Sequence, residues 1–94
     1  MNMHYVELFD YYGELFTDKQ KEYFMDYYFN NLTLQEIADN NVVSKNAVHK
    51  TIKDITEKLD YYESKLNLYS NKKKIEKLIE NIDKEIKEKI EELI

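Results

Sequence analysis

Cysteine, arginine and proline are absent from this 94-residue chain, and glycine occurs only once, at Gly13. Without cysteine there is no disulfide, and no thiolate is available for catalysis or for a zinc site. A single glycine excludes glycine-rich phosphate loops and argues against a sheet joined by tight turns, which need residues with positive φ. A chain of this length suits one small domain, which must be stabilised by helix packing, by a partner subunit, or by both.

Long hydrophobic runs are also absent. No run of about 18 apolar residues exists, so we predict no membrane-spanning segment. The first residues show no basic segment followed by an apolar one, so we expect no signal peptide and a cytoplasmic location. The histidines are His4 and His49 alone, and no nucleophile–base pair can be assembled, so we expect no metal, no cofactor and no enzymatic activity.

Charge is distributed unevenly along the chain. Residues 1–43 carry 2 lysines against 8 acids, residues 44–74 carry 8 against 4, and residues 75–94 carry 4 against 7, which together give the net charge of −5. An acidic total does not exclude nucleic acid, because the local charge decides where a phosphate backbone is attracted. The basic middle segment is therefore the first place to look for a binding surface.

Apolar residues spaced three and four apart predict an all-α fold. We expect helices over about 3–15, from Thr17 to Asn30–Asn31, from Thr33 to 39–41, from Ser44 to about Ser70, and over about 72–93. Thr17 to Gln20 and Thr33 to Glu36 are capping boxes, in which the threonine hydroxyl accepts from the backbone N–H three residues later. Ser44 is a further N-cap.

The helix that begins after Ser44 has apolar residues in a heptad pattern sustained for three heptads. They are Val48, Ile52, Ile55, Leu59, Tyr62, Leu66 and Tyr69. The part beyond Leu59 needs cover, either from the last helix as a hairpin or from a second chain, and we favour a homodimer because helix-turn-helix proteins often pair. The seam of that hairpin or dimer would comprise Leu59, Tyr62, Leu66, Tyr69, Ile75, Ile79, Ile82 and Ile86.

Residues 33–52 have the spacing of a helix-turn-helix motif. Ile37 and Val48 would be buried between the two helices, and Ala38 must be small where the helices cross. Val43 would fill the turn. The chain then divides into a helix-turn-helix domain, 1–69, and a C-terminal helix, 70–94, that packs on the long helix or on a partner subunit.

The turn of this motif departs from the usual pattern. Where such turns often have glycine, this one has Val42. Because a β-branched residue at positive φ is costly, we expect Asn40 or Asn41 to take the left-handed conformation instead.

A helix-turn-helix binds DNA by laying its second helix in the major groove, with the first residues of that helix at the base edges. Asparagine can bond adenine, and lysine can bond guanine or phosphate. The candidate nucleic-acid-binding residues on the second helix are Lys45, Asn46, His49, Lys50 and Lys53. Lys72, Lys73 and Lys74 form a second basic cluster, expected in a loop, that could hold phosphates.

Nine tyrosines could stack on bases, as in RNA-binding modules, or fill an amphipathic core. We favour core filling, because Tyr12, Tyr23, Tyr27 and Tyr62 have the spacing of core residues in helices.

The sequence resembles the YlxM family of small bacterial helix-turn-helix proteins, whose motif is similar to region 4 of sigma factors. The segments that carry the resemblance are 8–12, 15–20, 27–28, 32–38, 43–48, 52–53 and 62–66, with Leu59. The strings Leu8-Phe9-Asp10-Tyr11-Tyr12 and Leu32-Thr33-Leu34-Gln35-Glu36-Ile37-Ala38 are the most specific.

The resemblance implies a non-enzymatic regulator of the signal recognition particle pathway that binds the particle's RNA or nearby nucleic acid. Two alternatives remain open. One is a protein–protein adaptor that binds the particle's GTPase, with the motif as scaffold only. The other is a dimeric transcription regulator on duplex DNA, with half-sites about one helical turn apart.

Overall fold

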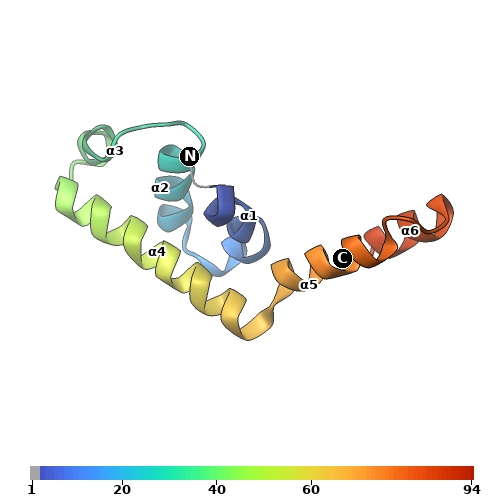
Figure 1. Cartoon of the computed structure of the whole chain (residues 1–94). Helices are drawn as coiled ribbons and strands as arrows, with labels where there is room; N and C mark the ends of the chain where they lie inside the picture. Colours follow the sequence, from blue (N-terminus) through green and yellow to red (C-terminus); the bar gives the residue numbers. More distant parts are fainter. Residues whose placement is uncertain (1–2) are drawn as a thin grey trace.

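The computed structural model describes residues 3–94, and in that range it is helical, which confirms the predicted all-α class (Figure 1). The elements are α1 (Met3–Tyr12), the 3-10 turn η1 (Gly13–Leu15), α2 (Asp18–Tyr28), α3 (Leu34–Asn41), α4 (Lys45–Leu66), α5 (Leu68–Ile79) and α6 (Lys84–Glu91). Helices α1, α2 and α3 pack along α4, whereas α5 and α6 form an arm that projects away from them.

The starts of three helices are where the sequence predicts them. The hydroxyl oxygens of Thr17 and Thr33 accept from the N–H groups of Gln20 and Glu36 at 3.2 and 3.1 Å. Both glutamine and glutamate side chains accept the reciprocal bond from the threonine N–H, so both capping boxes are complete. Ser44 caps α4 through the N–H of Ala47 at 3.1 Å.

The core consists of two clusters joined by α4. The first cluster contains Leu8, Tyr12, Phe16, Phe24, Ile55 and Leu59. The second contains Tyr23, Ile37, Ala38, Val48 and Ile52. Because α4 contributes its N-terminal half to one cluster and its middle to the other, it connects α1 and α2 to the helix-turn-helix.

The left-handed residue in the turn is Val42, with φ 55° and ψ 48°, so the expectation of Asn40 or Asn41 is wrong. The Asn41 side chain donates to the Ile37 carbonyl at 2.7 Å and accepts from Lys19 at 2.8 Å, which holds Asn41 within the helix. The chain therefore reverses its direction at the next residue, Val42. Val42 is 92% exposed, so its side chain does not pack against the core.

Backbone hydrogen bonds of the turn form a Schellman motif. The N–H of Val42 donates to Asp39, and the N–H of Val43 donates to Ala38. The Val43 side chain is 41% exposed, so it does not fill the turn as predicted. Helix α2 ends at Tyr28, shortly before the Asn30–Asn31 pair predicted to end it, and the left-handed residue of the following connection is Asn31.

Two further helix ends differ from the sequence prediction. Helix α1 stops at Tyr12, and Gly13 begins η1 rather than lying inside the helix. Helix α4 stops at left-handed Asn67, not near Ser70, because an asparagine adopts this conformation with little strain.

The segment after Asn67 is also organised differently. The single last helix expected over 72–93 is two helices, because Asp83 caps a new start through the N–H groups of Glu85 and Ile86. The lysines at 72–74 lie inside α5 and not in a loop. Helix α6 runs back beside α5, with Glu91 close enough to Lys72 to help raise the pKa of that lysine (Figure 1).

The bend between α4 and α5 is held by one carboxylate. Glu63 accepts from the Tyr12 hydroxyl at 2.6 Å and from the N–H groups of Tyr69 and Ser70 at 3.1 and 3.0 Å. The Tyr12 oxygen in turn accepts from the N–H of Leu68 at 3.1 Å. Burial alone would raise the pKa of Glu63, but the hydrogen bonds from Tyr12, Ser70 and Tyr69 outweigh it and lower the pKa.

Tyr69 completes this junction from α5. Its hydroxyl donates to Glu7 on α1, and its ring meets Tyr11 edge to face with centroids 6.4 Å apart. The direction of the arm is therefore set by contacts with α1 as well as by the backbone at Asn67.

Val42→Gly should stabilise the protein by about 1 kcal/mol, because glycine removes the strain of a left-handed β-branched residue without losing a buried contact. Urea denaturation followed by circular dichroism measures the change. Val43→Gly, next to it but not at positive φ, is the matched control and should destabilise. A Val42→Gly protein no more stable than the parent would contradict the strain.

Glu63→Ala should cost about 2 kcal/mol and release the arm, because it leaves two N–H groups and a hydroxyl without their charged acceptor. Hydrogen exchange at the Tyr69 and Ser70 amides should become faster while exchange in α2 is unchanged. Glu57→Ala, which removes only an exposed contact 4.0 Å from Lys53, is the control. Unchanged exchange at both amides would show that Glu63 does not hold the bend.

Candidate nucleic-acid interface

Helices α3 and α4 form the two helices of a helix-turn-helix. Ile37, Ala38 and Val48 are fully buried where they meet, as the motif predicts. The small side chain of Ala38 allows the two backbones to approach, and Ser44, the last of the three residues between the helices, caps α4. This packing leaves the opposite side of the first turns of α4 in solvent.

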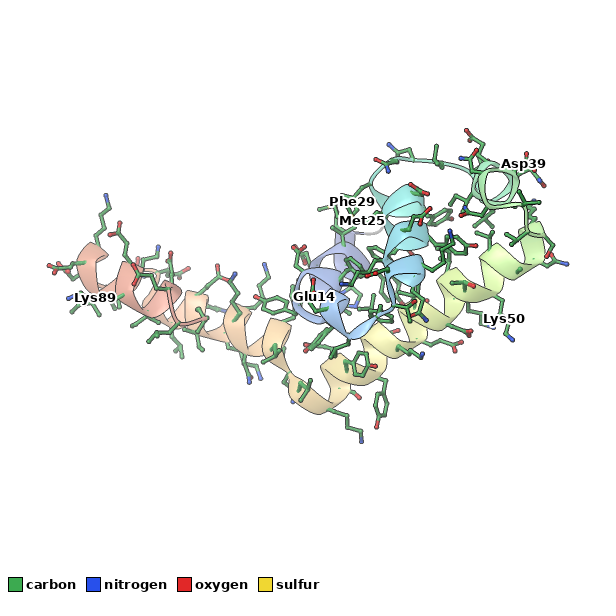
Figure 2. All side chains as sticks on the ribbon, turned by 180° about the vertical axis from the view of Figure 1, so that it is seen from behind. Glu14, Met25, Phe29, Asp39, Lys50 and Lys89 are labelled. Atoms are coloured by element: carbon green, nitrogen blue, oxygen red, sulfur yellow. The ribbon has the colours of Figure 1, made fainter. Side chains whose placement is uncertain are left out.

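The five predicted contact residues on α4 lie together on that side. Lys45, Asn46, His49, Lys50 and Lys53 are all exposed, and Figure 2 shows Lys50 pointing outward from α4. No carboxylate lies on α4 before Asp54. The surface is therefore cationic over about two and a half helical turns.

The lysines of this surface are largely free to meet a phosphate. Lys45 and Lys50 form no ion pair with a residue in 3–94, whereas Lys53 lies 4.0 Å from Glu57 with both side chains about two-thirds exposed. An exposed pair of this kind contributes little energy and dissociates readily.

The second predicted basic cluster is not adjacent to the first. Lys72, Lys73 and Lys74 lie on α5, at the other end of α4 (Figure 1). The Lys72 ammonium lies 5.8 Å from the Tyr11 ring centroid, and that of Lys73 lies 5.5 Å from the Tyr69 ring centroid. A hydrogen bond with Tyr11 raises the pKa of Lys72, with Glu76 and Glu91 adding to the effect. Only Lys74 lacks such a tyrosine contact in the described chain.

The predicted seam residues differ in their surroundings. Leu59 is fully buried in its own chain, and Tyr62 and Tyr69 are half-buried against the first core cluster. In the arm the exposed fraction is lowest at Ile79 and rises from there toward Ile86. The remaining seam residues are Leu66 at 51%, Ile75 half-buried, Ile79 at 7%, Ile82 at 39% and Ile86 at 54%.

An open groove of about 650 Å³ lies beside the cationic surface, and sequence reasoning missed it. It is lined by Tyr27, Tyr28, Asn31, Leu32, Thr33, Leu34, Gln35 and Lys45. Tyr27 is 36% exposed, so the prediction that it fills the core is wrong, whereas Tyr12 and Tyr23 are buried as predicted. Tyr27 has the three–four spacing of core residues in a helix, but the loop after α2 does not cover the Tyr27 side chain.

Fold and surface together define a helix-turn-helix protein whose second helix is free to contact nucleic acid. Comparison with known families agrees. The family model UPF0122, described as "Putative helix-turn-helix protein, YlxM / p13 like", matches residues 1–94, and the chain belongs to this family. The predicted resemblance to the YlxM family is thereby confirmed.

Individual relatives support the assignment. A UPF0122 protein of Malacoplasma penetrans is 41% identical over 92 residues, covering 92% of this chain and 86% of that protein. One of Fusobacterium nucleatum is 41% identical over 90 residues, with 95% and 87% covered. One of Clostridium botulinum is 44% identical over 82 residues, with 87% and 75% covered.

Two features are absent from residues 3–94. None of the helices there has the length and apolar character needed to cross a membrane. Within the same range, no three His, Asp or Glu side chains are grouped so that they could hold a metal ion.

Proposed function

We propose that this protein is a non-enzymatic regulator that binds nucleic acid through α3 and α4, and that it acts in the signal recognition particle pathway by binding the particle's RNA. The observation that carries the proposal is the surface formed by Lys45, Asn46, His49, Lys50 and Lys53, which begins at the capped start of α4 and contains no carboxylate.

The chemistry of this surface suits a phosphate backbone. Lysines supply point charges that release counterions from nucleic acid, while Asn46 and His49 supply hydrogen-bonding groups for base edges. The net negative charge of the molecule lies in residues 1–43, which carry 2 lysines against 8 acids, so it repels phosphate from α1 and α2. The choice of the particle's RNA comes from the resemblance to the family described above.

Two other functions make different predictions. An adaptor for the particle's GTPase would use the exposed apolar residues of the arm, such as Leu78 and Leu93, at 79% and 84% exposure. Its affinity would depend little on salt, and the protein would co-elute with the purified GTPase. A dimeric transcription regulator would protect two DNA half-sites about one helical turn apart.

Lys45→Glu/Lys50→Glu should abolish most binding to the particle's RNA, because it removes two phosphate contacts and adds repulsion. The slope of log affinity against log salt, from about 50 to 300 mM, should fall by about two units in magnitude. Fluorescence anisotropy with labelled RNA, beside a random DNA duplex, measures both.

The matched control is Lys58→Glu/Lys65→Glu, which makes the same charge change on a different side of α4. Parent-like binding by the Lys45→Glu/Lys50→Glu protein, or equal losses in both variants, would rule out this surface. No binding of the parent protein to either nucleic acid at the lowest salt would rule out the proposed function and favour the adaptor.

We further propose that the protein is a homodimer joined through the arm. Helix α6 has eight residues and none is buried, whereas a helix shorter than about 12–15 residues is marginal in water without packing. Ile82 just before this helix and Ile86 within it leave apolar surface uncovered.

Analytical ultracentrifugation at micromolar concentration should therefore show a dimer, and Leu78→Glu/Ile86→Glu should convert it to a monomer by burying charge at the contact. Lys74→Glu, an exposed charge change on the same arm, should leave the dimer intact. A monomeric parent protein would contradict the dimer without affecting the nucleic-acid surface.

A further inference from the structure

We propose that the groove between the end of α2 and the starts of α3 and α4 binds one unpaired nucleotide, with its base against Tyr27 and its phosphate at Lys45. The proposal rests on the nucleic-acid-binding function proposed above and adds a ligand class to it. An unpaired nucleotide can come from an RNA loop or bulge, or from single-stranded DNA.

The aromatic surface of the groove, formed by Tyr27 and Tyr28, rests on the core. Tyr28 packs against both core clusters, and Tyr27 meets it edge to face with ring centroids 5.1 Å apart at 88°. Tyr27 thus packs against a half-buried neighbour while remaining 36% exposed. A partly exposed ring that already packs against a neighbouring ring is suited to stacking with a base, because less side-chain freedom is lost on binding.

Polar groups suited to a base edge line the same groove. The Asn31 amide has no hydrogen-bond partner in the described chain. The Gln35 amide nitrogen donates to Asp39 at 2.8 Å, which orients the side chain and leaves its carbonyl oxygen as an acceptor. Stacking combined with hydrogen bonds to an exposed edge is how proteins recognise unpaired bases.

Charge in the groove favours a phosphate. The chain has 19 acidic residues and a net charge of −5, yet the lining contains no carboxylate and one lysine, Lys45. Its volume of about 650 Å³ is within the range of small-ligand sites, about 300–1,000 Å³.

The position of Lys45 connects the groove to the helix-turn-helix surface. Lys45 is the first residue of α4, so it belongs both to the groove lining and to the surface that carries Lys50 and Lys53. A strand whose backbone follows the start of α4 would therefore bring its next nucleotide to Tyr27. A base within a duplex cannot enter without leaving its stack, so the nucleotide must be unpaired.

The test compares four labelled probes at one low salt concentration: a blunt DNA duplex, the same duplex with a single-stranded overhang, a blunt RNA duplex, and an RNA hairpin with an unpaired loop. The parent protein should bind the probes with unpaired nucleotides about tenfold more tightly than the blunt ones, which is within the range that stacking of one base supplies. Tyr27→Ala should remove this preference, and Tyr27→Phe should retain it.

Two controls separate the groove from folding and from the α4 surface. Met25→Ala, which truncates a 40% exposed side chain on the same helix, should leave the preference unchanged (Figure 2). Lys50→Glu should weaken all probes equally. Should Tyr27→Ala fail to fold by circular dichroism, Tyr27→Leu removes the ring while keeping apolar bulk and serves in its place.

Several results would overturn the groove as a nucleotide site. Equal binding of blunt and unpaired probes by the parent protein would do so, as would an equal loss on all probes in the Tyr27 variant. In both cases the proposed function survives if Lys50→Glu weakens blunt-duplex binding. If the Tyr27 variant loses only its binding to the particle's GTPase, the groove is a protein-binding site. If the parent protein binds none of the probes, both proposals are rejected.

Discussion

The structure depends on one stripe of apolar side chains along α4. Val48, Ile52, Ile55 and Leu59 are 6% exposed or less, and helices α1, α2 and α3 all pack on them. Both core clusters include side chains of this helix and no disulfide supports them, so the packing of this small chain depends on this one helix. The same helix presents its opposite side to solvent, which couples the position of the cationic surface to the integrity of the core.

The arm is attached through hydrogen bonds at the bend together with the packing of Tyr69 against the core. At the bend after Asn67, the carboxylate of Glu63 satisfies two first-turn N–H groups of α5 that would otherwise lack partners, while Tyr12 and Tyr69 connect the same point to α1. The direction of the arm is therefore defined even though only Ile79 in it is buried. This arrangement leaves apolar surface exposed on the arm, at the opposite end of the molecule from the groove and the α4 surface.

Nucleic-acid binding by an acidic protein requires that its charges be separated in space. Here the first turns of α4 have lysines without carboxylates, and the groove beside them likewise has a lysine and no acid in its lining. The tyrosine-rich composition has two uses in the same molecule. Tyr12 fills the core and bonds Glu63, whereas Tyr27 stands at an open groove next to Lys45.

Local sequence patterns predict the helix starts, the buried stripe of α4 and the helix-turn-helix spacing. Thr17, Thr33 and Ser44 cap helices through groups three residues away, so no distant contact is needed to form them. The five polar residues at the start of α4 share a side for the same reason, because helical periodicity alone places them there. Family membership was also predictable, because the matching strings lie within these local motifs.

Tertiary contacts determined the backbone conformation at positions where the local sequence allows more than one. Val42 is left-handed because Asn41 is held by Ile37 and Lys19, and Lys19 lies on another helix. Asn67 and not Ser70 ends α4, since the turn there brings Glu63 onto the start of α5 and Tyr69 onto Glu7 of α1. Tyr27 has the spacing of a core residue, yet no helix covers it. The open groove beside it results from the arrangement of α2, α3 and α4 together and not from any one segment.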